Sequence, residues 1–250
     1  MIAGTALPDA SPLARLRIAR PVDRYEYVKA RCRGRRVLDL GAYDETEFGR
    51  HPADRWRWLH AHIADSASEV LGVDASEDLR AHGSIETPAG TRIVFGDVER
   101  LEPIIDSFRP DLIVAGELIE HTPNTLGWLR RLAACAPGTA VLLTTPNATS
   151  IVNLLLALAN RENCHPDHLH VYSVRTIHTL AARVPIHAVS IRPYFYDPHL
   201  FFARVPGWVA PAVKLADWLV LRPLQWAFPM TAFGLIVEGV LGPEPRTAGL

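Results

Sequence analysis

The sequence has few of the features that mark disulfide-rich, zinc-binding or membrane-spanning proteins. Its 250 residues include only three cysteines, Cys32, Cys135 and Cys164, which are widely spaced and form no Cys-x-x-Cys pair. This argues against a disulfide framework and a structural zinc site, and it favours a reducing compartment. The first residues lack a charged start followed by a long apolar stretch, so we expect no signal peptide and a cytoplasmic location. No apolar run approaches the length of a membrane span.

Charge of one sign is also lacking. The formal net charge is −1, and only Lys29 and Lys214 are lysines. Without a basic stripe, the chain shows no footprint for a nucleic-acid backbone, so nucleic acid is not an expected partner. The most apolar region, 205–228, is interrupted by Lys214, Asp217, Arg222 and several prolines. We expect it not to cross a bilayer, which leaves contact with a membrane surface open.

Short apolar runs alternate with helical patterns along the chain. The runs cover residues 36–41, 69–74, 91–97, 111–116, 140–146, 186–196 and about 230–240. Helical periodicity is found in 25–31, 46–64, 126–136, 151–160 and 173–183. Strands and helices that alternate at short intervals predict a doubly wound α/β fold, with helices on both faces of a parallel sheet.

Acidic residues lie at the ends of three predicted strands. Asp39 is followed by Gly41, where backbone can approach a ligand closely, and Asp74 and Asp97 end the next two strands. An acid at the end of the second strand can hydrogen-bond both hydroxyls of a ribose, and one at the end of the third can accept from an adenine amino group. Taken singly, Asp39 and Asp74 are better explained by capping of a strand end. Together the three acids predict a site for an adenosine-containing cofactor.

The segment Glu117-Leu-Ile-Glu-His121 follows the fourth strand. If a helical turn starts there, the spacing places Glu117, Glu120 and His121 on one face. Carboxylates with imidazoles suit Mg²⁺ or Mn²⁺ better than a thiolate-preferring metal. The alternative is that the two glutamates cap a helix and His121 packs against it. Downstream, a loop-like segment supplies further imidazoles in His165, His168 and His170.

These pieces resemble a class I S-adenosylmethionine-dependent methyltransferase from about residue 25 to 183. The matching pieces are Val37-Leu-Asp-Leu-Gly41, Gly72-Val-Asp74, Gly96-Asp97, Glu117 to His121 and Thr145-Pro146-Asn147. The resemblance implies one domain over residues 1–250, with a seven-stranded, mostly parallel Rossmann-like sheet, an antiparallel last strand and a substrate-side insert at about 197–229. It implies that S-adenosylmethionine binds at Asp39, Gly41, Asp74, Asp97 and Val98.

The first glycine loop departs from the family pattern. The family usually has two or three glycines there, whereas Ala42 and Tyr43 follow the single Gly41. The chain also lacks Gly-x-Gly-x-x-Gly and Gly-Lys-Ser/Thr, so pyrophosphate binding is not expected. Because S-adenosylmethionine carries no pyrophosphate, this departure weakens a dinucleotide interpretation more than a methyltransferase one.

Within that superfamily, Glu-x-x-Glu-His, Thr-Pro-Asn and Asp167-His168 are similar to a metal-dependent subset. This subset includes the small-RNA 3′-terminal 2′-O-methyltransferases and, less closely, the quinone-pathway O-methyltransferases. The resemblance implies that Glu117, Glu120, His121 and His168 hold Mg²⁺, which chelates neighbouring hydroxyls of the acceptor. Glu120, His165 and His168 are the expected catalytic residues, and the sequence leaves open which of His165, His168 and His170 is a ligand or a base.

We therefore expect a Mg²⁺-dependent O-methyltransferase whose acceptor is a hydroxyl of a sugar or polysaccharide precursor. The family resemblance extends to the methylmannose-polysaccharide methyltransferases of actinobacteria. A phenolic or quinone-like lipid and an RNA 3′-terminal ribose are alternative acceptors. A cofactor-binding regulatory domain without activity is the alternative from another class of protein, and the sequence does not decide the oligomeric state.

Overall fold

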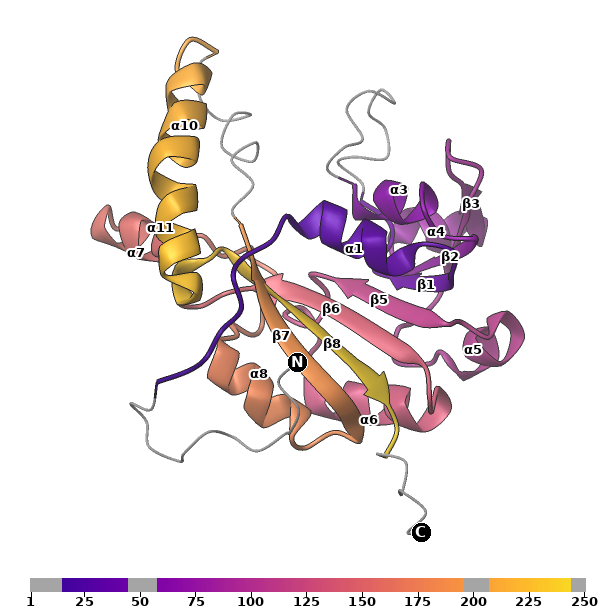
Figure 1. Ribbon diagram of the computed structural model, residues 1–250. Helices are drawn as coiled ribbons and strands as arrows, with labels where there is room; N and C mark the ends of the chain where they lie inside the picture. The colour runs from indigo at the N-terminus through magenta and orange to yellow at the C-terminus, as the bar shows by residue number, and fades with distance from the viewer. Residues whose placement is uncertain (1–14, 45–57, 196–206, 244–250) are drawn as a thin grey trace.

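The computed structural model describes residues 15–44, 58–195 and 207–243. They form one eight-stranded sheet flanked by helices (Figure 1). The strands are β1 (Arg36–Leu40), β2 (Glu69–Asp74), β3 (Ser84–Glu86), β4 (Arg92–Phe95), β5 (Leu112–Gly116), β6 (Ala140–Pro146), β7 (Ile186–Tyr194) and β8 (Gly234–Leu241). The helices are α1 (Arg24–Cys32), α3 (Leu59–Ala64), α4 (Glu77–His82), α5 (Glu102–Phe108), α6 (Thr125–Cys135), α7 (Ile151–Leu158), α8 (Val174–Ala181), α10 (Ala210–Ala216) and α11 (Arg222–Ala227).

The strand order is β3-β4-β2-β1-β5-β6-β8-β7. The five strands from β4 to β6 are parallel to their neighbours, as expected for strands joined by helical crossovers. The late strand β8 is antiparallel to both β6 and β7, and β3 is antiparallel to β4. The Rossmann-like fold with an antiparallel strand near the end is thus confirmed. The expected count of seven was wrong by one, because the three-residue β3 is too short to show a periodic pattern.

Alternating residues of the central strands point to opposite faces of the sheet and form two apolar clusters. Leu38, Ile113 and Val141 belong to the cluster that includes buried side chains of α5, α6 and α8. Val37, Val114 and Leu142 belong to the cluster that includes buried side chains of α1, α3 and α7. Both faces of the sheet are covered, which explains why its strands are continuous apolar runs.

Most of the expected helices are present, with side chains that cap their first turns. Asp23 caps α1, Asn124 caps α6 and Ser173 caps α8, each accepting a hydrogen bond from a backbone amide of the first turn. The short helices α4 and α5 were not expected from the sequence. Of the helix predicted for 46–64, the described part contains α3, and the remainder lies outside the described residues.

The described part of the predicted insert is helical. Helix α10 continues through a π turn, η2 (Asp217–Leu221), into α11, and a short 3₁₀ turn, η3 (Pro229–Thr231), leads to β8. The three helical pieces form a rod that projects beyond the sheet (Figure 1). Among the described residues, we find no helix that is both long enough and apolar enough to cross a bilayer.

Candidate active site

The predicted site residues meet at the carboxyl ends of neighbouring strands. Strand β1 lies between β2 and β5, so the chain leaves it where the order of strands reverses. Backbone bonds align the segments that follow: the amide of Gly41 donates to Val73 (2.9 Å), and the amide of Glu117 donates to Thr144 (2.9 Å). In open α/β sheets, such a switch point is where ligands bind.

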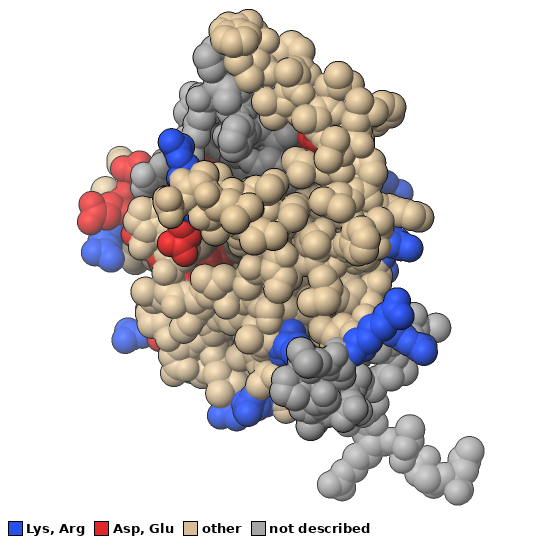
Figure 2. Space-filling model, turned by 90° about the vertical axis from the view of Figure 1, so that its left-hand side faces the viewer, with Lys and Arg blue, Asp and Glu red and all other residues tan. Residues whose placement is uncertain are grey.

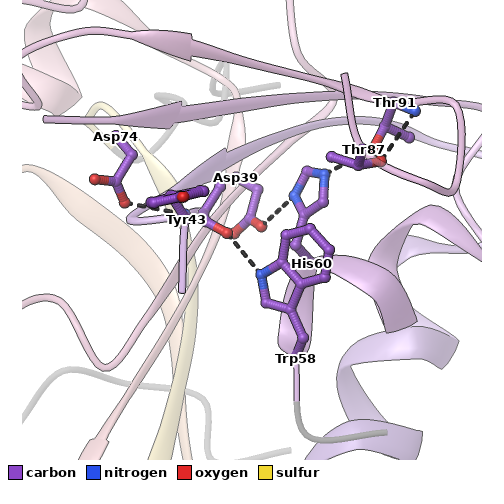
Figure 3. A network of polar contacts seen from close by, with 8 residues as sticks. Asp39, Tyr43, Trp58, His60, Asp74, Thr87 and Thr91 are labelled. Carbon is purple, nitrogen blue, oxygen red and sulfur yellow. Dashed lines mark hydrogen bonds and ion pairs between the residues drawn. The ribbon is translucent and has the colours of Figure 1, made fainter. Parts of the chain in front are cut away.

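Asp74 at the end of β2 holds the loop after β1. Its carboxylate accepts from the backbone amides of Tyr43 (3.0 Å) and Ser76 (2.9 Å), as Figure 3 shows for Tyr43. Burial raises the pKa of Asp74, and these two backbone bonds oppose that shift. Each carboxylate oxygen can accept a second hydrogen bond, so Asp74 retains capacity for a ligand donor such as a ribose hydroxyl.

Asp39 is buried and faces inward rather than toward the open strand edge. Its side chain accepts from Nδ1 of His60 at 2.8 Å, and Nε2 of the same ring lies 2.8 Å from the hydroxyl of Thr91 (Figure 3). Trp58 adds an indole bond of 2.8 Å to the carbonyl of Ala42. His60 and Trp58 were not expected as site residues, because only the fold brings the start of α3 under the β1 loop.

The glycines explain how this loop is built with one glycine after β1. Gly41 has a φ of +72°, in the left-handed region that favours glycine. A Cβ on Gly72 of β2 would lie 2.8 Å from the Cβ of Ala42 and 3.1 Å from His60. The backbone of β2 therefore approaches Ala42 closely, and hydrogen bonds with Trp58 and Asp74 hold the loop in place.

Asp97 and Val98 follow β4 as predicted. The carboxylate of Asp97 accepts from the amide of Glu99 (2.8 Å), and more than half of its side chain is exposed. The carbonyl of Val98 accepts from the indole of Trp128 (2.8 Å), which fixes the position of this segment over α6. Asp97 is thus accessible to a ligand at the edge where Asp74 also lies.

Glu120, His121 and His168 form the group of possible metal ligands. One ligand atom from each lies within 4.8 Å of the others. His165 stands next to this group, with its ring 6.0 Å from that of His121 and 5.8 Å from that of His168. Residues from two separate loops therefore converge on one point.

The carboxylate of Glu120 is the most constrained member. The residue is 1% exposed, and neither oxygen has a hydrogen bond of normal geometry within the described structure. Burial, followed by the charge of Glu117, raises the pKa of Glu120 to about 8, and the neighbouring Thr145 hydroxyl acts in the opposite direction. Burying a charged carboxylate without a partner is unfavourable, so Glu120 is expected either to be protonated or to bind a cation.

Backbone bonds hold the histidine loop against the Glu120 turn. The carbonyl of Glu120 accepts from the amides of Leu169 (2.8 Å) and His170 (3.1 Å). His168 in turn lies edge-on to His121, with 4.6 Å between ring centroids. Burial, and then the neighbouring His121 and His165, lower the pKa of His168, which favours the neutral form that binds metals.

Glu117 lies outside this three-residue group. Its φ is +55°, and residues 118–121 form a turn rather than the helical turn considered from the sequence. Its Oε1 accepts from the hydroxyl of Tyr194 (2.8 Å) and lies 3.4 Å from Arg24. The capping alternative also does not apply, because Asn124 caps the following helix. Arg24 and Tyr194 were missed in the sequence, where they lie far from the motif.

The other histidines differ in position. His165 accepts from the amide of Asp167 (3.3 Å) and is largely exposed, so its ring is accessible beside the metal-ligand group. His170 is half-buried, and its Nε2 lies 3.4 Å from the carbonyl of Pro123. The structure therefore brings His165 and His168, but not His170, to the cluster.

The fold and the site together define a Rossmann-like methyltransferase. The chain matches the methyltransferase domain family over residues 13–184 and belongs to that family. It is accordingly an S-adenosylmethionine-dependent methyltransferase. No curated protein matches the chain.

Solved structures show the same fold at low sequence identity. The methyltransferase domain of bacterial CtHen1-CN is 15% identical with a TM-score of 0.51, and the match covers 88% of this chain and 98% of that one. A chain from the complex of the Haloferax volcanii Trm112 methyltransferase activator with its methyltransferase is 14% identical with a TM-score of 0.50, over 88% and 89%.

Proposed function

We propose that this protein is an O-methyltransferase that uses Mg²⁺ or Mn²⁺ to methylate a hydroxyl of a sugar or polysaccharide precursor. The observation that carries the proposal is the buried carboxylate of Glu120, whose oxygens make no hydrogen bond of normal geometry within the described residues and which shares a 4.8 Å cluster with His121 and His168. A divalent cation would supply the charge that this carboxylate lacks.

The chemistry of the donor set supports a hard cation. The cluster contains no thiolate, which argues against a soft metal, and its carboxylate is a ligand that Mg²⁺ and Mn²⁺ accept. Both described contacts of Glu117 use Oε1, and we propose that its Oε2 adds a further ligand. Such a set leaves coordination positions for the oxygens of an acceptor.

The protein residues have separable tasks in this reaction. When bound, the metal would lower the pKa of a coordinated aliphatic hydroxyl, and S-adenosylmethionine would supply a methyl group on a good leaving group. His165, exposed beside the cluster, is proposed to accept the hydroxyl proton. Glu120, His121 and His168 would hold the metal ion so that it could align the acceptor oxygen with the methyl group, and this alignment contributes much of the rate of methyl transfer.

The cofactor side of the site is proposed from the strand ends. Asp74 is assigned to the ribose hydroxyls, and Asp97 with the Val98 segment to the adenine. Asp39 is not assigned a direct contact with the cofactor. Its carboxylate is bound to His60, and we propose that this pair supports the loop that contains Gly41. Since strand-end acids are common, this assignment depends on Asp74 and Asp97 lying at the same edge of the sheet.

Two other acceptors share the same chemistry. An RNA 3′-terminal ribose also offers neighbouring hydroxyls, although the net charge of −1 provides little attraction for a phosphate backbone. A phenolic or quinone-like lipid is favoured by exposed apolar side chains on α7 and on the α10–α11 rod. The alternative of a non-catalytic cofactor-binding domain gives no reason to bury Glu120, because burial disfavours the charged form of its carboxylate.

The test combines metal removal with an acceptor screen. Labelled S-adenosylmethionine is offered with sugars, phenols and short RNAs, in EDTA and after addition of Mg²⁺ or Mn²⁺. Glu120→Gln should abolish metal-dependent transfer, whereas Glu99→Gln, an exposed glutamate paired with Arg131, should not. Full activity in EDTA would refute the requirement for a metal ion. Methyl transfer to phenols alone would refute a sugar as the acceptor.

A further inference from the structure

The helices next to the site expose an unusual number of large apolar side chains. On α7, Leu154, Leu155 and Leu158 are 56%, 51% and 77% exposed. On η2, Trp218, Leu219 and Val220 are 67%, 54% and 59% exposed. We call these six residues the apolar face. Figure 2 shows the side of the molecule on which these helices lie as a broad expanse with few charged side chains.

The rod is amphipathic in the opposite sense to an ordinary surface helix. Its buried positions are polar: Asp217 is 4% exposed and Gln225 is 0% exposed. Asp217 pairs with Arg222 at 2.9 Å, so the charge on the inner side is matched. A helix in water normally turns its apolar side inward, and this arrangement therefore indicates that an apolar medium covers the outer side.

Basic residues outnumber acids in the segments that form or contact the rod and α7. The segments 15–22, 151–158 and 207–230 contain five basic residues and a single acid, the buried Asp217. Arg20 donates to the carbonyl of Trp226 and stacks over its indole at 4.1 Å, which attaches the segment with Arg15 and Arg17 to the rod. Because the whole chain has a charge of −1, this concentration of cations is local.

We propose that the apolar face docks on the surface of an anionic lipid bilayer. Exposed tryptophans beside cations are the composition of segments that lie in the interface of a membrane. The described helices are too short or too polar to cross it, so the protein would lie on the bilayer. A second copy of this chain fits less well, because a two-fold interface would bring the same cations face to face.

Hydrogen bonds join the rod to the start of α7, and the histidine loop also exposes apolar side chains. Asn147 and Thr149, just before α7, donate to the carbonyl of Met230 at the end of the rod (2.8 and 2.7 Å). Leu169 and Val171, which follow His168, are 58% and 56% exposed. If the proposed function holds, the bilayer would present hydroxyl acceptors carried on lipids to the metal cluster.

The experiment measures binding of the full chain to vesicles, so it does not depend on methyl transfer. Co-sedimentation and tryptophan emission are recorded with vesicles of phosphatidylcholine alone and of phosphatidylcholine with phosphatidylglycerol. We expect binding to the anionic vesicles, a blue shift of emission and weakening by salt. Trp218→Ser with Leu219→Ser should lower the partition coefficient roughly tenfold or more.

Two further variants separate the contributions. Phe95→Ser removes an exposed aromatic residue from β4, outside the apolar face, and should bind as the wild type does. Arg17→Glu should weaken binding to anionic vesicles only. Thermal melting checks that each variant is folded. If the wild type does not bind anionic vesicles, the proposal is wrong. It is also wrong if the wild type is a dimer in solution and the double variant is a monomer.

Discussion

The hydroxyl of Tyr194 donates a 2.8 Å hydrogen bond to Oε1 of Glu117, joining the end of β7 to the residue that follows β5. Tyr194 is 2% exposed, and Arg24 approaches the same oxygen from the start of α1. The bond explains how Glu117 is held in a left-handed conformation that a residue with a side chain rarely adopts. The position of Glu117, a proposed metal ligand, therefore depends on contacts with α1 and β7, which are distant in sequence.

Tyr194→Phe should therefore destabilise the fold. Hydrogen bonds to charged groups contribute roughly 1.5–3 kcal/mol, so we expect a loss of about that size in the free energy of unfolding, measured with urea in EDTA. Tyr27→Phe is the matched control, because its hydroxyl donates to Glu238 at 2.6 Å in a more exposed setting and should cost less. An equal or smaller loss for Tyr194→Phe would contradict the importance of the Glu117 bond.

Asp74→Ala should weaken binding of S-adenosylhomocysteine in titration calorimetry. A ribose hydroxyl bonded to a carboxylate is worth roughly 1.5–3 kcal/mol, a loss of about one to two orders of magnitude in affinity. Asp78→Ala serves as a control, because Asp78 accepts from the Tyr43 hydroxyl (3.1 Å) on the exposed side of the same loop. Unchanged affinity in a folded Asp74→Ala protein would remove the ribose assignment.

Three alanine variants distinguish the tasks of the histidines. His168→Ala should raise the Mg²⁺ concentration needed for activity, and excess Mg²⁺ should restore part of the rate. His165→Ala should lower the rate at saturating Mg²⁺, because the proton acceptor is lost. His170→Ala should change neither, since its ring contacts the Pro123 carbonyl instead of the cluster. A metal defect in His170→Ala alone would mean that the ligand was chosen wrongly.

Cys32 provides a test of pH dependence away from the site. Its side chain is fully buried, and burial raises the pKa of the thiol from about 9 to about 12. The unfolded thiol ionises first as the pH rises, so stability is retained below pH 9 and lost between 9 and 12. The loss should be about 1.4 kcal/mol per pH unit in this window.

Urea unfolding at several pH values compares the wild type with Cys32→Ala, and with Cys164→Ala as the control. The Cys32 variant starts less stable because a cavity is left, but its stability should fall less steeply above pH 9. The slope of the Cys164 variant should match the wild type. Identical slopes for all three proteins would show that the Cys32 thiol ionises in the folded state.

The central sheet could be predicted because its strands are buried on both faces. Residues 36–41, 69–74 and 111–116 are short, mostly apolar segments, and the structure places a strand in each of them. Strand β3 and helices α4 and α5 have at most seven residues, too few for a period to be recognised. Their positions are set by packing against neighbours distant in sequence.

The candidate site was predictable only where its residues are close in sequence. Glu120 and His121 are adjacent, and His168 lies in a segment rich in histidine, so the motif indicated a cluster before the fold was known. The placement of Glu117 depends on Arg24 and Tyr194, and that of Asp39 depends on His60. Such partners come from contacts that no local spacing encodes.

The position of β8 has a consequence for synthesis of the chain. This strand pairs with β6 on one side and β7 on the other, yet it follows both in the sequence. While the segment from α7 to α11 is being translated, the edge of β6 that will pair with β8 has no neighbouring strand. During this time β7 also has no strand with which to pair. An unpaired apolar edge readily recruits other strands. The nascent polypeptide is therefore most exposed to misassembly, and most in need of chaperones, until residues 234–241 emerge.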